Sequence, residues 1–192
     1  MKQHKFLIPG LLLLVVFLFT SCSNPKRHYD AGEALEGADK RLLANREYMR
    51  ALKGTNDRKK KAELQKRIAN NCRIGKQYQE AITYYKQSIE NYNMFGMNAP
   101  YQRLAECYIS IGNTGAAAAL TKDLGGKKPK DYMVHQAEIS KAIGAHYELK
   151  KDFNEASYYY EQYMKYAVQL KNGKMLRDAK IRLDDVKVKL NK

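Results

Sequence analysis

The sequence predicts an all-α protein built from repeated helical hairpins and closed by a C-terminal helix. Its composition favours helices, because the 192 residues include no Trp and only four Pro, and helix formers are abundant. The decisive pattern is an alanine with one aromatic residue three positions earlier and another four positions later. This pattern is complete around Ala81, in residues 78–85, and around Ala156, in residues 153–160.

The chain opens with a segment typical of an exported protein. Lys2 and Lys5 precede an apolar run over residues 6–20, which at 15 residues is shorter than the about 20 that span a bilayer. This order predicts a signal peptide over residues 1–21. The end of the segment resembles a bacterial lipobox, which implies cleavage before Cys22 and its lipidation. A plain signal peptide with an incidental cysteine is the alternative.

Residues 22–28 are expected to form a short lipidated linker. Ser23, rather than Asp, follows Cys22. By resemblance to known sorting signals, this implies the periplasmic face of an outer membrane. Two or more acyl chains make a stable anchor, so the folded part is expected to stay at one membrane surface.

The alanine signature predicts about four hairpins over residues 29–171. Its anchors lie 37, 36 and 39 residues apart, at Ala44, Ala81, Ala117 and Ala156. Small residues also mark the predicted first helices, at Ala69, Ala105 and Gly144. Antiparallel helices approach closely where one presents Ala or Gly and the other fills the gap with an aromatic ring.

This signature resembles the tetratricopeptide repeat (TPR), whose period is 34 residues. The resemblance implies stacked helix pairs whose first helices line a groove for extended peptides or partner helices. A generic helical bundle with coincidental spacing is the alternative.

Turn and cap residues predict the boundaries between these hairpins. Gly54 ends one helix and Asp57 offers a cap to the next, residues 93–100 form a linker, and Asp131 is a candidate cap. Asn172 and Gly173 end the last repeat.

A capping helix is expected over residues 174–192. Its apolar stripe consists of Leu176, Ala179, Leu183, Val186 and Leu190. A terminal helix of this kind covers the exposed face of the last repeat. A weak homodimer through the same stripe is the alternative.

The positive net charge of the mature chain indicates which kinds of partner it binds. Removing residues 1–21 leaves 33 basic residues against 20 acidic ones, a net charge of +13 on 171 residues. The export signal argues against nucleic acid, so anionic lipid, anionic glycan or acidic protein faces are the expected targets. After lipidation only Cys72 and Cys107 remain; they could pair in an oxidising compartment, or stay as buried free thiols.

No catalytic or metal-binding pattern is present. The sequence lacks HExxH, G-x-S-x-G and C-x-x-C. We therefore expect no enzyme, no cofactor and no metal site.

Three surfaces are candidate binding sites. The resemblance implies a groove lined by polar side chains of the first helices: Glu63, Lys66, Asn70, Arg73, Gln102, Glu106, Glu138, Lys141 and Glu148. Lys66 and Asn70 match the start of a clamp for a peptide carboxylate, but Glu138 stands where that clamp has Lys, which excludes it. The second surface is Tyr158 and Tyr159, and the third is the basic patch of Arg58, Lys59, Lys60 and Lys61. A solvated helix face is the alternative for each.

The sequence thus predicts a membrane-anchored TPR lipoprotein that acts as a scaffold or accessory subunit of an envelope assembly or secretion complex. The layout resembles outer-membrane lipoproteins of β-barrel assembly, pilus assembly or type IX secretion. The alternative function is a basic envelope-binding module for anionic lipid or glycan.

Overall fold

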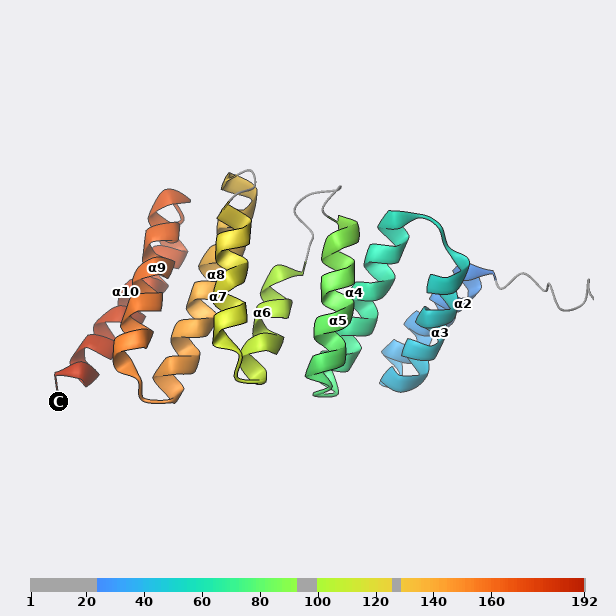
Figure 1. Cartoon of the computed structure of the whole chain (residues 1–192), viewed down its shortest axis with the longest axis horizontal. Helices are drawn as coiled ribbons and strands as arrows, with labels where there is room; N and C mark the ends of the chain where they lie inside the picture. The colour runs from blue at the N-terminus through green and yellow to red at the C-terminus, as the bar shows by residue number, and fades with distance from the viewer. Residues whose placement is uncertain (1–23, 93–99, 126–128, 192) are drawn as a thin grey trace, which may run out of the picture. The chain divides into compact units, whose positions relative to one another are not determined.

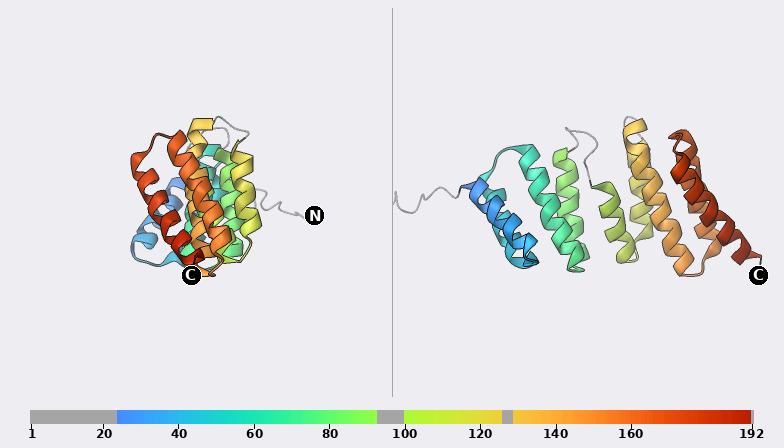
Figure 2. Two further views of the ribbon diagram at one scale, coloured as in Figure 1. Left: turned by 90° about the vertical axis from the view of Figure 1, so that its left-hand side faces the viewer. Right: turned by 180° about the vertical axis from the view of Figure 1, so that it is seen from behind.

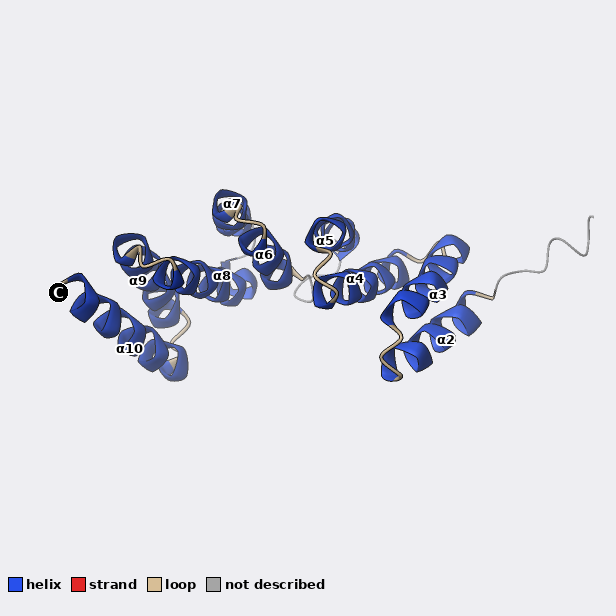
Figure 3. Cartoon of the chain, turned by 90° about the horizontal axis from the view of Figure 1, so that it is seen from below, coloured by secondary structure: helices blue, strands red, loops and turns tan. Residues whose placement is uncertain are grey.

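The structure is a computed structural model that describes residues 24–92, 100–125 and 129–191. Every regular element in these ranges is an α-helix, which confirms the all-α prediction (Figure 3). Cys22 and the predicted signal peptide lie outside the described residues, as does most of the linker predicted at 93–100.

The chain divides into two compact units, Met1–Gly54 and Thr55–Lys192. The first contains the hairpin of α2 (Pro25–Gly37) and α3 (Arg41–Gly54). The second contains three more helix pairs and a last helix (Figure 1): α4 (Arg58–Ile74), α5 (Tyr78–Tyr92), α6 (Tyr101–Ser110), α7 (Thr114–Gly125), α8 (Pro129–Leu149), α9 (Phe153–Gln169) and α10 (Gly173–Leu190).

Two helix starts differ from the sequence prediction. Helix α2 begins at Pro25, inside the range predicted as linker, because the Asn24 side chain caps the Lys26 amide and Pro suits the first helical position. Helix α8 also begins at a proline, Pro129, so Asp131 is the third residue of the helix rather than its cap.

The hairpins are packed through small residues, as predicted. All four anchor alanines are completely buried. Twelve residues before each anchor, the first helix carries a small residue: Gly32, Ala69, Ala105 or Gly144. A Cβ atom on Gly32 or Gly144 would collide with the ring of Tyr48 or Tyr160, respectively.

The turns inside the four hairpins share one backbone conformation. Asp39, Lys76, Gly112 and Lys151 all have positive φ, and each lies five residues before its anchor alanine. In the turn between the two helices of the fourth hairpin, the Asp152 amide donates to the Tyr147 carbonyl and the Lys151 amide donates to the Glu148 carbonyl. These two bonds make a Schellman motif, which ends the first helix and reverses the chain.

Helix α10 covers the last hairpin, and Figure 2 shows it packed beside α9 in both views. It buries Met175, Ala179, Leu183 and Val186 against α9. The buried stripe therefore begins at Met175, whereas Leu176, which was predicted in it, is exposed. Both Met175 and Leu176 stand at helical spacing from Ala179, and it is Met175 that packs with Tyr163 and Ala167 of α9. Leu190, also predicted in the stripe, is exposed as well.

Candidate functional site

The polar residues predicted on the first helix of the second hairpin are held by intramolecular contacts. The Lys66 ammonium lies 2.7 Å from a Glu63 carboxylate oxygen and 5.6 Å from the centroid of the Tyr92 ring. The Tyr92 hydroxyl donates to Glu63 at 2.7 Å, and the Tyr85 hydroxyl donates to the Asn70 amide oxygen at 2.6 Å. Burial raises the pKa of Glu63, but the bonds from Lys66 and Tyr92 outweigh it, so the pKa lies below its ordinary value.

Two of the predicted residues, Arg73 and Gln102, contact a third one, Glu106 of α6. Arg73 of α4 reaches the Glu106 carboxylate at 3.7 Å, and the Gln102 amide donates to it at 3.3 Å. Arg103, on the same helix, donates to both oxygens at 2.9 and 3.0 Å. The structure thus joins the second and third hairpins through charges that the sequence analysis assigned to the groove.

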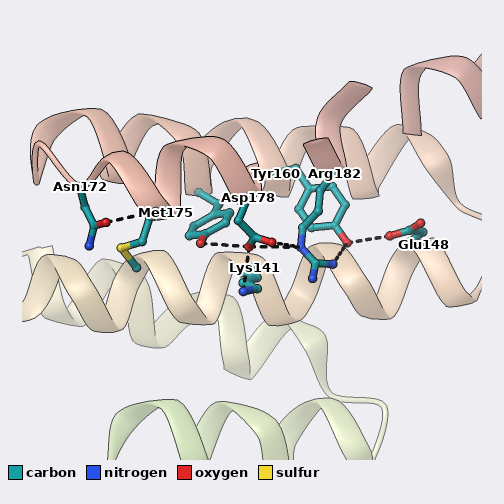
Figure 4. A network of polar contacts seen from close by, with 8 residues as sticks. Lys141, Glu148, Tyr160, Asn172, Met175, Asp178 and Arg182 are labelled. Atoms are coloured by element: carbon teal, nitrogen blue, oxygen red, sulfur yellow. Dashed lines mark hydrogen bonds and ion pairs between the residues drawn. The ribbon is translucent and has the colours of Figure 1, made fainter. Parts of the chain in front are cut away.

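Two of the three predicted residues of α8, Lys141 and Glu148, bind the C-terminal helix (Figure 4). The Lys141 ammonium lies 2.8 Å from an Asp178 oxygen. Glu148 accepts a bond of 2.7 Å from the Tyr160 hydroxyl and another of 2.8 Å from the Lys189 ammonium. Burial, followed by the bond to Glu148, raises the pKa of Tyr160 to about 12. Lys141 and Glu148 therefore help to fix α10 on the last hairpin.

Asp178 is the centre of this network, and sequence reasoning missed it. It accepts bonds from the Tyr163 hydroxyl at 3.2 Å and from the Arg182 guanidinium at 3.3 Å. Arg182 also reaches the Tyr160 hydroxyl at 3.5 Å. The available signal was the i,i+4 spacing of Asp178 with Arg182, repeated by Asp185 with Lys189.

The aromatic surface is built from two helices. Tyr158 of α9 is 54% exposed, and its ring meets the Tyr159 ring edge-on with centroids 5.1 Å apart. The Tyr159 ring stacks on Tyr147 of α8, with centroids 5.8 Å apart and an interplanar angle of 11°. The Tyr147 hydroxyl lies 3.1 Å from the Thr114 hydroxyl. We call Tyr147, Tyr158 and Tyr159 the tyrosine platform; Tyr147 was not among the residues predicted for this surface.

Comparisons with protein-family models and with curated proteins find no match for this sequence.

The basic patch lies at the start of α4, as predicted. Arg58, Lys59 and Lys60 are exposed, and Lys61 is half-buried. Asp57 caps the helix, since its carboxylate accepts from the Lys59 and Lys60 amides at 2.9 and 3.2 Å. Within the described residues, no carboxylate lies within 4 Å of the ammonium groups of the three lysines.

Cys72 and Cys107 are both buried and are not joined by a disulfide. Burial raises the pKa of Cys107 to about 11, so its thiol is protonated at neutral pH. Across residues 24–92, 100–125 and 129–191 there is no group of three or more side chains that could hold a metal ion. In the same ranges no helix has the length and apolar character needed to cross a bilayer.

Proposed function

We propose that this chain is a lipid-anchored helical-repeat scaffold of the TPR type, which holds a partner protein at the cell envelope. The N-terminal pattern supports the anchor, since Lys2 and Lys5, the apolar run and Cys22 follow the order of a lipoprotein signal. The hairpins with their small-residue contacts support the scaffold, because stacked hairpins offer broad surfaces for protein partners. The proposed site of action is the periplasmic face of an outer membrane.

The tyrosine platform is the observation that carries the scaffold role. Repeat packing requires Tyr160, which is completely buried, but it leaves Tyr158 more than half exposed. Tyr158 is held in place by Tyr159, which in turn stacks on Tyr147. A rigid, partly exposed tyrosine binds at little entropic cost, and tyrosine is enriched among the residues that dominate interface energies.

The polar residues of the first helices take a supporting role in this proposal. Arg73 and Glu106 join neighbouring hairpins, Gln102 bonds to Glu106 on the same helix, and Lys141 and Glu148 fix α10. A partner that lies along the first helices would contact a surface whose charges already satisfy one another. The charges of such a surface orient a bound partner and discriminate between partners, and they contribute little to the affinity.

Crosslinking in living cells, followed by purification and mass spectrometry, tests the scaffold. We expect stoichiometric envelope proteins that are lost from the Tyr158→Ala variant. Ile181→Ala is the matched control, because Ile181 is 69% exposed on α10 and outside the platform. Equal recovery of the same partners with both variants would contradict the platform as the binding site.

Membrane release tests the anchor separately. Cys22→Ser removes the sulfur that lipidation requires, so we expect the variant in the soluble fraction. A variant that stays with the membranes would overturn the lipoprotein assignment.

The basic patch supports a second candidate, a module that binds anionic lipid or glycan. Lys59 and Lys60 are exposed and have no carboxylate within ion-pair distance among the described residues. The dependence of binding on salt concentration distinguishes the two candidate functions. Binding of lipid or glycan through exposed charges weakens steeply with ionic strength, whereas binding of a partner protein through the tyrosine platform does not.

A further inference from the structure

The two ends of the hairpins in the second unit differ in how charge is arranged. Helices α4, α8 and α10 begin at one end, which is the upper edge in Figure 1 and in the right-hand view of Figure 2. The turns inside the hairpins, such as the one at Lys151, lie at the opposite end. Because a helix N-terminus carries partial positive charge and a C-terminus partial negative charge, each end has a preferred sign of side chain.

At the opposite end most charges follow this preference, and the exception is Glu148 in the last turn of α8, which is paired with Lys189. Glu80 and Glu155 lie in the first turns of α5 and α9, which begin there. Arg73 lies in the last turn of α4, and Lys187 and Lys189 lie in the last turn of α10. Most charges at this end therefore stabilise their own helices.

At the end where α4 and α10 begin, the charges in the first turns of these two helices oppose the preference, although Lys122 in the last turn of α7 follows it. The first turn of α4 consists of Arg58, Lys59, Lys60 and Lys61, and α10 begins with Lys174 one position after its start. Neither first turn contains an acidic residue, and neither does that of α6. We call the side chains of Lys59, Lys60, Lys61, Lys171 and Lys174 the basic edge.

Neighbouring carboxylates leave much of this charge uncompensated. Asp57 is engaged in capping α4, and the other acidic residues in the terminal turns at this end are Glu90, Asp123 and Asp131. None of the lysines of the basic edge has a carboxylate within 4 Å among the described residues. The helix N-termini add their own positive potential, so the edge attracts anions more strongly than its side chains alone.

Exposed aliphatic side chains accompany the lysines. Val168, at the end of α9, is 57% exposed, and Leu176, in the first turn of α10, is also exposed. They lie on either side of the turn that carries Lys171, whose φ is 51°. Lysine side chains beside exposed aliphatic groups can bind a bilayer surface. Their ammonium groups contact the lipid headgroups, and the aliphatic carbons lie at the boundary with the acyl chains.

We propose that the basic edge binds the headgroups of anionic phospholipids and so sets the orientation of the second unit on the membrane. Charge complementarity carries the choice of occupant, and the aliphatic neighbours favour a bilayer over a soluble polyanion. The membrane location rests on the proposed function, since the anchor at Cys22 is part of it. In the first unit, Lys26 and Arg27 likewise occupy the first turn of α2, which has no acidic residue.

Fluorescence quenching on vesicles tests this orientation. Full-length protein would be reconstituted into vesicles of phosphatidylglycerol and phosphatidylcholine that contain a headgroup-labelled quencher lipid. One label is attached at Val168→Cys on the basic edge, and the other at Leu149→Cys, which is 86% exposed at the opposite end. The buried thiols of Cys72 and Cys107 are protected from the label.

We expect the label at position 168 to be quenched and the label at position 149 to be quenched much less. Each lysine near an anionic surface contributes about fivefold to binding, so charge reversal at Lys59, Lys60 and Lys174 is expected to abolish the difference. The matched control reverses Lys76, Lys150 and Lys151, which are exposed at the opposite end, and leaves the difference intact.

Equal quenching at the two positions, or the same quenching in vesicles of phosphatidylcholine alone, would overturn the proposal. So would a difference that survives charge reversal of the basic edge, because the orientation would then come from the anchor. Tyr158→Ala separates this proposal from the scaffold, since it removes the partner site and leaves the orientation unchanged. Conversely, release of Cys22→Ser from membranes after a high-salt wash tests the anchor, because the wash weakens binding through the basic edge.

Discussion

Gly144 and Tyr160 are packed so closely that their helices have no room for a methyl group between them. A Cβ atom on Gly144 would lie 2.8 Å from the Cδ1 and Cε1 atoms of the Tyr160 ring. Tyr160 is completely buried and donates its hydroxyl to Glu148. The ring is therefore fixed by packing on one side and by a hydrogen bond at its far end.

Gly144→Ala is expected to lower the free energy of unfolding by about 1–3 kcal/mol, because the tyrosine ring must move away from a site that holds it. Urea unfolding of the full chain measures the change. Gly173→Ala is the control, since a Cβ atom on Gly173 meets nothing within 4 Å. Equal destabilisation by both substitutions would show that the effect is not the contact with Tyr160.

Much of this fold was predictable because it depends on short-range patterns. Ala81 and Ala156 each have an aromatic residue on both sides, and Ala44 and Ala117 could be aligned with them because the spacing between anchors is similar; all four are buried. The contact of Gly32 with Tyr48 follows the same rule, twelve residues before Ala44, but Gly32 alone carries no signature. The spacing becomes informative only after the four anchors are aligned.

The candidate site was harder to predict because its residues have two possible uses. Tyr158, one of the two tyrosines predicted to form a surface, is exposed, whereas the neighbouring Tyr160 is core. It assigned Lys141 and Glu148 to a groove, whereas the structure pairs them with Asp178 and Lys189 of α10. A charged residue on a first helix looks the same whether it faces a ligand or a neighbouring helix, and only the packing of α10 separates the two.

Lys151 is strained by the turn that it occupies. Its φ is 60°, a conformation that costs an L-residue about 1 kcal/mol and costs glycine almost nothing. Lys151→Gly is therefore expected to raise the free energy of unfolding by up to about 1 kcal/mol, measured by urea unfolding. The equivalent turn already has glycine, at Gly112, so Gly112→Ala is expected to destabilise by a similar amount. A loss of stability in Lys151→Gly would mean that the lysine side chain contributes more than its backbone costs.

Glu148 makes the stability depend on pH in the acid range. Burial raises its pKa, but the bonds from Lys189 and Tyr160 outweigh burial, so the folded pKa lies below the ordinary value of 4.5. A carboxylate with a depressed folded pKa stabilises fully above its unfolded pKa, and this contribution is lost as the pH falls through the folded pKa. Unfolding between about pH 6 and pH 3 should therefore be less pH-dependent in Glu148→Gln than in the wild type.

Asp184→Asn is the control for this prediction, because Asp184 is exposed on α10 and takes no part in the network around Glu148. Its curve of stability against pH is expected to follow that of the wild type. If Glu148→Gln loses stability on acidification as steeply as the wild type, the carboxylate does not hold α10 through an ionised form.

Lys60 reduces the stability of the helix to which it belongs. It lies in the first turn of α4, where partial positive charge accumulates, and it has neither an acidic neighbour in that turn nor an ion-pair partner within 4 Å among the described residues. Lys60→Glu replaces repulsion with attraction and creates the capping-box spacing with Asp57. We expect a gain of about 0.5–1 kcal/mol in unfolding free energy, with Lys86→Glu, exposed in the middle of α5, as the neutral control. If the variant is more stable and also loses its orientation on anionic vesicles, Lys60 contributes to membrane binding and destabilises its own helix. If the stability is unchanged, Lys60 does not oppose the dipole of α4, and this support for the basic edge is lost.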